Sequence, residues 1–108
     1  MSHMIVTTGN DVTGSRVSGH LGLVRGIVVR SPRIGQSFMG GVKQSVGGTI
    51  ESYAAVCETA REEAYERMVQ HAMERGADAV IAFRYDATEF SPGVTEVLAY
   101  GTAVKLER

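Results

Sequence analysis

The feature that most constrains this chain is a stretch of 27 residues, Thr49 to Arg75, that contains neither glycine nor proline. Gly47-Gly48 precede it and Gly76 follows it, as expected for a helix bounded by helix-breaking residues. Such a helix is roughly 40 Å long, whereas a compact domain of 108 residues is only about 34 Å across. One small sheet can hardly cover this helix, so its length favours an assembly in which neighbouring copies share the covering.

An apolar stripe about 140° wide follows one face of this predicted helix. Arg61 interrupts the middle of the stripe, and His71 lies at its edge. A guanidinium keeps its charge, so a buried Arg61 requires a carboxylate or several carbonyl groups as partners. We expect this partner to be Asp78, Asp86 or a carboxylate of a neighbouring copy. The stripe consists of Ile50, Tyr53, Ala54, Cys57, Ala60, Ala64, Tyr65, Met68 and Ala72.

Four other segments have the composition of strands, and Ser91-Pro92-Gly93 predicts a turn that joins the last two as a hairpin. With the helix, they indicate an α+β fold, one long helix on one face of a small antiparallel sheet. We expect a single domain over residues 4–108, with residues 1–3 as a probable cloning remnant. The predicted strands are Met4–Thr8, Leu21–Arg30, Ala79–Phe90 and Thr95–Leu106.

The predicted strands carry signs of close packing. Gly22 and Gly26 indicate bulges or the close approach of another backbone. One face of the third strand carries Ile81, Phe83 and Tyr85. One face of the last strand is almost wholly small, which predicts that another element packs tightly against it; its residues are Val97, Ala99, Gly101 and Ala103.

The segment Ser31–Gly48 is rich in glycine, and a structureless loop of this length is unusual in a compact domain. Gln36–Ser45 fits either a short helix or a mobile flap. In both interpretations the segment is a candidate lid or contact region.

Composition narrows the class of protein. With 44% hydrophobic and 21% charged residues the chain is a soluble globular protein rather than a disordered one. No stretch approaches the ~18 apolar residues of a membrane span, so we expect no membrane partner. The lone Cys57 excludes an internal disulfide, which favours a cytoplasmic location.

Charge is distributed unevenly along the chain. Residues 1–48 carry five basic side chains and one acidic one, whereas the helix carries six glutamates and three arginines. A basic patch for nucleic acid is one interpretation. No aromatic side chains alternate with these basic residues to stack on bases. We therefore favour basic and acidic surfaces that meet within or between subunits, and expect no nucleic-acid partner.

The helix offers few metal ligands. Cys57 and His71 are 14 residues apart, hence about 21 Å along the axis, so they cannot bind one ion within a single copy. Glu58, Glu62 and Glu66 form an acidic ridge, which is either a weak site for a hard cation or a solvated helix face. We favour the solvated face and expect no tight, stoichiometric zinc or copper site.

Cys57 lies one turn before Arg61 on the predicted helix. A neighbouring cation can activate a thiol. The alternative is a buried cysteine that acts as a small apolar residue beside a structural arginine. We favour the alternative, because no general base or catalytic cysteine motif lies nearby in the sequence.

Several motifs in order resemble the YbjQ-like family, an uncharacterised family also described as a heavy-metal-binding domain. They are Val46-Gly47-Gly48, Tyr53, Ala60-Arg61-Glu62, Gly76-Ala77-Asp78-Ala79-Val80 and Gly101-Thr102-Ala103-Val104-Lys105. The resemblance spans Ile5 to Lys105. It implies a dodecin-like protomer that assembles into a ring, a homopentamer or a pair of pentamers forming a decamer. Arg61 and Asp78 fall on the shared pattern, whereas Cys57 does not.

These observations favour a non-enzymatic oligomeric scaffold that binds a small ligand or a metal between subunits. The alternative is an enzyme with an interfacial site around Arg61 and Cys57, although no acid-base or nucleophile arrangement is recognisable. No residue is assigned a catalytic role, and neither a cofactor nor a metal is specified. The ligand-binding candidates are Tyr53, Cys57, Arg61, Asp78 and His71.

Overall fold

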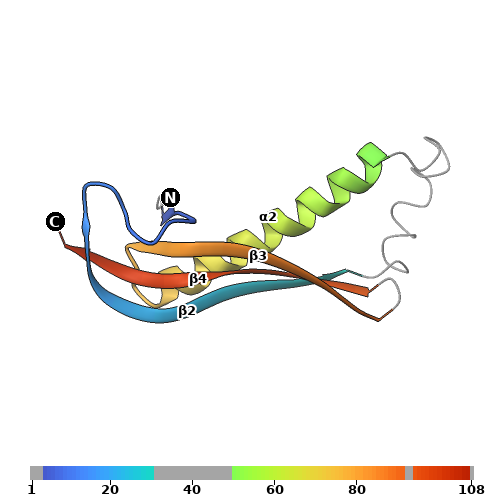
Figure 1. Cartoon of the computed structure of the whole chain (residues 1–108). Coiled ribbons are helices and arrows are strands. Elements are labelled where there is room, and N and C mark those ends of the chain that lie inside the picture. Colours follow the sequence, from blue (N-terminus) through green and yellow to red (C-terminus); the bar gives the residue numbers. More distant parts are fainter. Residues whose placement is uncertain (1–3, 31–49, 92–93, 108) are drawn as a thin grey trace.

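The computed structural model describes residues 4–30, 50–91 and 94–107, with the side chains of all of these except residues 50–56 and 90. Figure 1 shows one helix running along one face of a narrow, twisted sheet, which confirms the predicted α+β class. The predicted short helix or flap at Gln36–Ser45 lies outside the described residues. The elements are β1 (Ile5–Val6), β2 (Arg16–Arg30), α2 (Ile50–Glu74), β3 (Ala79–Ser91) and β4 (Val94–Glu107).

The strands lie in the order β1-β3-β4-β2, and β4 is antiparallel to both of its neighbours. The prediction of a wholly antiparallel sheet is wrong for β1, which pairs parallel with the start of β3. β2 begins at Arg16, five residues before the predicted Leu21. Its pairing with β4 extends back to Arg16 across two register shifts, one between Val17 and Gly19 and one between His20 and Gly22. Such irregularities let a strand continue past a point where the regular pairing is interrupted.

The helix covers Ile50–Glu74 and ends one residue before the predicted Arg75, while the predicted first residue, Thr49, lies outside the described residues. Its C-terminus is capped by Gly76, whose φ of 75° is the left-handed conformation that glycine adopts at low cost. The N–H of Gly76 donates to the carbonyl of Met73 at 3.0 Å, and that of Ala77 to the carbonyl of Ala72 at 3.1 Å. This pair of bonds is a Schellman motif, which ends the helix and directs the chain into β3.

The helix packs on the sheet mainly through small side chains. Ala60, Ala64, Met68 and Ala72 repeat at one-turn intervals and are at most 3% exposed. The predicted stripe is therefore confirmed from Ala60 to Ala72, and the predicted small face of β4 is confirmed as its contact. These helix residues form the main core with Val24, Val28, Val80, Phe83, Val97, Ala99 and Ala103.

A bulge in β3 exchanges the two faces of that strand. Ala82 has a φ of 55°, and the register with β4 shifts between Ile81 and Arg84. Phe83 therefore lies beneath the helix, where its ring meets the ring of Tyr65 edge-on at 5.7 Å. Ile81 belongs to a second cluster, so the prediction that it shares a face with Phe83 and Tyr85 is wrong. The prediction assumed that side chains alternate regularly along the strand, and an inserted residue breaks this alternation.

The second cluster covers part of the sheet face that the helix leaves free. Ala79, Ile81 and Val104 are buried there, and Val12, from the segment between β1 and β2, packs on them. No described element covers the rest of this face. The molecule measures 54 × 24 × 23 Å with a radius of gyration of 16.9 Å, against about 13 Å for a compact domain of this length.

Candidate functional site

Apolar side chains line the uncovered part of the sheet, which we call the open face: Leu23, Ile27 and Val29 of β2 with Leu98 and Tyr100 of β4. Leu23 is 52%, Ile27 37% and Val29 49% exposed. They alternate along β2 with the buried residues of the helix side, and Ile27 is directly opposite Leu98. Side chains opposite one another in a pair of strands interact, so Ile27 and Leu98 form an apolar contact on the open face. Arg25 and Glu96 lie on the same face, next to these apolar residues.

Charged residues flank the open face in register. Arg25, Tyr100 and Arg84 form one row across β2, β4 and β3, while Asp86 lies in the row of Leu98 and Ile27. The guanidinium of Arg84 donates to the carbonyl of Thr8 at 3.0 Å, which ties the N-terminal segment to this end of the row. Apolar and charged side chains thus occur together on this exposed face, as they do in protein-protein contact surfaces.

Three basic side chains, two on α2 and one in the turn that follows it, bind backbone groups on the outer edge of β2 at intervals of four residues. We call Arg67, His71 and Arg75 the edge row. Arg67 also binds the carboxylate of Glu63, which binds Arg30 as well. The edge-row contacts are Arg67 Nη1 to the Ile27 oxygen at 2.7 Å, the Arg25 N–H to His71 Nδ1 at 3.2 Å, and Arg75 Nη1 to the Leu21 oxygen at 3.0 Å.

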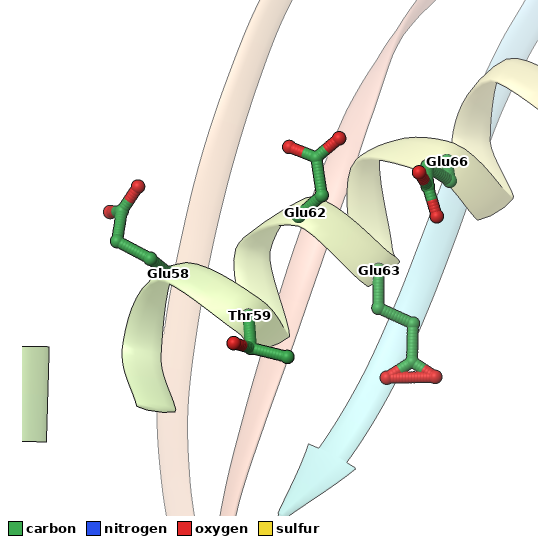
Figure 2. A pocket seen from close by; sticks show the side chains of 5 residues that line it. All are labelled: Glu58, Thr59, Glu62, Glu63 and Glu66. Atoms are coloured by element: carbon green, nitrogen blue, oxygen red, sulfur yellow. The ribbon is translucent and has the colours of Figure 1, made fainter. Parts of the chain in front are cut away.

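The acidic ridge lies on the solvent side of α2, as predicted, and forms an open depression with Thr59 (Figure 2). The carboxylates that line this depression do not all converge, because Glu58 and Glu62 of the ridge point to one side of the helix and Glu63, outside the ridge, points to the other. Within the described residues no three His, Cys, Asp or Glu side chains are grouped as metal ligands would be. The structure therefore offers no preformed ion site along this face of the single chain.

Cys57 and Arg61 are both exposed in the single chain, which contradicts the expectation that they are buried in the apolar stripe. The helix diverges from the sheet toward its N-terminus (Figure 1), so the stripe loses its cover between Ala60 and Cys57. The guanidinium of Arg61 binds Glu58 of its own helix at 3.3 Å rather than the predicted Asp78 or Asp86. It is thus directed to a carboxylate and not to the thiol.

Asp78 anchors the turn between α2 and β3 to the last strand. One carboxylate oxygen accepts the N–H of Leu106 at 2.8 Å, and the other lies 3.4 Å from the ammonium of Lys105. That ammonium also donates to the carbonyl of Gly76 at 3.1 Å, next to the helix cap. Asp78 and Lys105 thus have a structural part in the fold.

The phenol of Tyr85 lies where the helix leaves the sheet. Its hydroxyl is 3.5 Å from the carbonyl oxygen of Arg61, a long hydrogen bond. Burial raises the pKa of Tyr85 above its usual value of 10.0, and nearby acidic groups act in the same direction while the Arg61 guanidinium opposes them. Those acidic groups are, in decreasing order of effect, Glu62, Tyr65 and Glu58.

The predicted site residues do not come together in one chain. Cys57 and Arg61 lie toward the N-terminal half of α2, His71 lies on the β2 edge, and Asp78 follows the helix. The side chain of Tyr53 lies outside the described residues. The edge row was not predicted as a unit, although its i, i+4, i+8 spacing was available as a signal.

The chain belongs to the YbjQ_1 family, described as "Putative heavy-metal-binding", with a match over residues 4–107. This confirms the resemblance drawn from the sequence. A UPF0145 protein of Chromobacterium violaceum is 56% identical, over 95% of this chain and 88% of that protein. A UPF0145 protein of Legionella pneumophila (strain Corby) is 54% identical, over 94% of this chain and 96% of that protein.

The fold has a counterpart among solved structures. A protein of unknown function from Pediococcus pentosaceus, of the DUF74 family, superimposes with a TM-score of 0.59 at 17% identity. The superposition covers 96% of this chain and 98% of that one. Among the described residues, no helix combines the length and apolarity needed to span a membrane.

Proposed function

We propose that this protein is a subunit of a homo-oligomeric ring that serves as a binding scaffold, with its ligand site between subunits. The observation that carries the proposal is the open face, on which three large aliphatic side chains are more than a third exposed. Contiguous apolar surface flanked by charge is typical of a contact with another protein. A second copy is the partner we favour, because the chain has a second uncovered region of its own.

That second region is the outer part of α2. Ala60 is buried and Cys57, one turn earlier, is exposed, so the cover of the apolar stripe stops between them. Two different uncovered surfaces on one chain favour head-to-tail contact, which closes into a ring when the rotation between copies allows it. The proposed number of copies comes from the family resemblance, which implies a homopentamer or two paired pentamers.

A heavy metal fits the described residues of one chain poorly. The donors that a soft ion prefers are sulfur and imidazole nitrogen. Cys57 and His71 are 14 residues apart on α2, about four turns, and Nδ1 of His71 already accepts the N–H of Arg25. We therefore favour a small ligand over a metal at the subunit boundary. The exposed thiol also supports a reducing location such as the cytoplasm.

Light scattering tests the assembly. At micromolar concentration we expect the wild type to be an oligomer, and Ile27→Lys to dissociate it because a charge is placed in the centre of the open face. Met73→Lys is the matched control, since Met73 is 43% exposed on α2, away from this face. A wild type that remains a single chain, or an Ile27→Lys variant of unchanged mass, would overturn the proposal.

Native mass spectrometry and metal titration test what the ring binds. We expect a co-purified small molecule on the wild type that is absent from dissociated Ile27→Lys. We expect no binding of one Zn²⁺ or Cu²⁺ per chain at submicromolar affinity. A stoichiometric site of that strength, abolished by Cys57→Ala, would show instead that the family description applies and that the ligand is a metal.

A further inference from the structure

The edge row contains one contact that depends on protonation. Arg67 and Arg75 donate to carbonyl oxygens of β2, and a guanidinium can do so at any pH at which proteins fold. His71 is an acceptor rather than a donor, because its Nδ1 accepts the N–H of Arg25 at 3.2 Å. Acceptance requires a lone pair on Nδ1, so this contact fixes the neutral imidazole with its proton on Nε2.

Charged groups of both signs lie near His71. Arg67 lies one turn before His71 on α2 and Arg75 one turn after it, just beyond the helix end, while the carboxylate of Glu74, three residues after His71, accepts a hydrogen bond from Gln70. From β2 the backbone of Arg25 faces the ring, and this residue is itself basic. Protonation would therefore add a charge between two guanidinium groups.

The other strands offer no compensating acid. The residues of β4 that face α2 are uncharged, namely Val97, Ala99, Gly101 and Ala103. On β3 the titratable group beneath the helix is Tyr85, which lies against Arg61, ten residues before His71. The electrostatic surroundings of the imidazole are thus set by α2 and β2.

We propose that His71 is a pH-sensitive latch that holds α2 against the outer edge of β2, and that its protonation opens this edge at Arg25. A proton on Nδ1 places two donors, the ring N–H and the Arg25 N–H, against each other, and the contact is lost. Imidazole groups change charge between about pH 5 and pH 8. The strand edge then presents an unpaired N–H, the kind of group through which edge strands pair with other chains.

Residue-resolved hydrogen exchange tests the latch. The protection of the Arg25 amide, after division by its intrinsic exchange rate, is expected to fall by about three- to tenfold between pH 8 and pH 5, as befits the loss of one hydrogen bond. The amide of Val24 is the internal reference, because successive residues of a strand direct their N–H groups to opposite edges and Val24 pairs with β4.

Two variants separate the latch from general acid effects. His71→Asn retains an acceptor at the δ position that does not titrate, so its Arg25 protection is expected to be independent of pH. His20→Asn, which removes an exposed imidazole elsewhere on β2, should behave as the wild type. A second readout needs no variant: the ¹⁵N shifts of the His71 ring should report the Nε2–H form at pH 8 and change with the same midpoint as the protection.

The outcomes are decisive in both directions. Constant Arg25 protection in the wild type across this range would overturn the proposal. So would a pH-dependent loss in His71→Asn equal to that of the wild type, or a His71 ring that carries its proton on Nδ1 at pH 8. The readouts report locally on His71 and Arg25, whereas the ring is tested by its mass, so the latch and the proposed ring can fail separately.

Discussion

A side-chain carbon placed on Gly26 would lie 2.1 Å from the carbonyl oxygen of Ala64 and 2.5 Å from the backbone nitrogen of Met68. The helix backbone thus rests directly on the backbone of β2. This explains why the helix-facing side chains are so small: larger ones would hold the two elements apart. The predicted close approach at Gly26 is confirmed, and Gly22 lies at a register shift with a φ of 97°.

The close contact at Gly26 predicts that one added methyl group there lowers the stability of the fold strongly. Gly26→Ala must displace helix backbone, which cannot rotate away, so we expect a loss at or above the upper end of the ~1–3 kcal/mol typical of overpacking. Gly19→Ala on the same strand meets nothing within 4 Å and should change stability by less than about 0.5 kcal/mol. Urea denaturation at one fixed protein concentration measures both. Equal midpoints for the two variants would contradict the contact.

The turn after the helix gives a second prediction. Asp78→Ala removes the acceptor of the Leu106 N–H and the partner of Lys105, and we expect it to cost about 1.5–3 kcal/mol, as for hydrogen bonds to charged groups. Asp86→Ala is the control, because that exposed carboxylate accepts only a local bond from Ala87 among the contacts described. Thermal unfolding of both variants would test this. A larger loss for Asp86→Ala would show that Asp78 is not the anchor.

Arg61 gives a prediction about the stability of the single chain, independent of contacts between copies. In the single chain its side chain is 47% exposed and its partner Glu58 76% exposed, so the pair should contribute less than about 1 kcal/mol. We therefore expect Arg61→Ala to have little effect on stability in the dissociated Ile27→Lys background. A loss of several kcal/mol there would mean that Arg61 is buried within its own chain after all.

Tyr85 gives a prediction at alkaline pH. Its pKa is raised in the folded chain, chiefly by burial and next by Glu62, so folding favours the neutral phenol. This stabilisation is complete below the unfolded value near 10 and is lost as the pH rises through the folded pKa. We expect Tyr85→Phe to remove a step above pH 10 from the tyrosinate absorbance titration of the folded protein. An unchanged step in Tyr85→Phe would refute the assignment.

Much of the fold follows from local sequence patterns. The absence of glycine and proline from Thr49 to Arg75 predicted the helix to within a residue, and the small face of β4 predicted a tightly packed neighbour. The bulge at Ala82 and the parallel pairing of β1 were not predictable, because both depend on hydrogen bonds with Thr7 and Gly9, far away in the sequence.

The site was less predictable than the fold, for a geometric reason. A helical period gives the direction of each side chain around the axis, but it does not tell where along the axis the sheet ends. Cys57 and Arg61 were therefore assigned to a covered stripe that in fact loses its cover after Ala60. The contacts of the edge row were not predictable from the sequence either, because they are made with backbone groups of β2 and such groups give no sequence signal.

Because the sheet covers α2 unevenly, we expect the helix to unfold from one end. Near Gly76 the helix is capped, anchored through Asp78 and packed on the sheet, whereas toward Ile50 it stands away from the strands. Opening should therefore begin at the Ile50 end and progress toward Gly76, with amide protection increasing along the helix. In the ring that we propose, a neighbouring copy would hold this weak end, and fraying there would leave the rest of the domain folded.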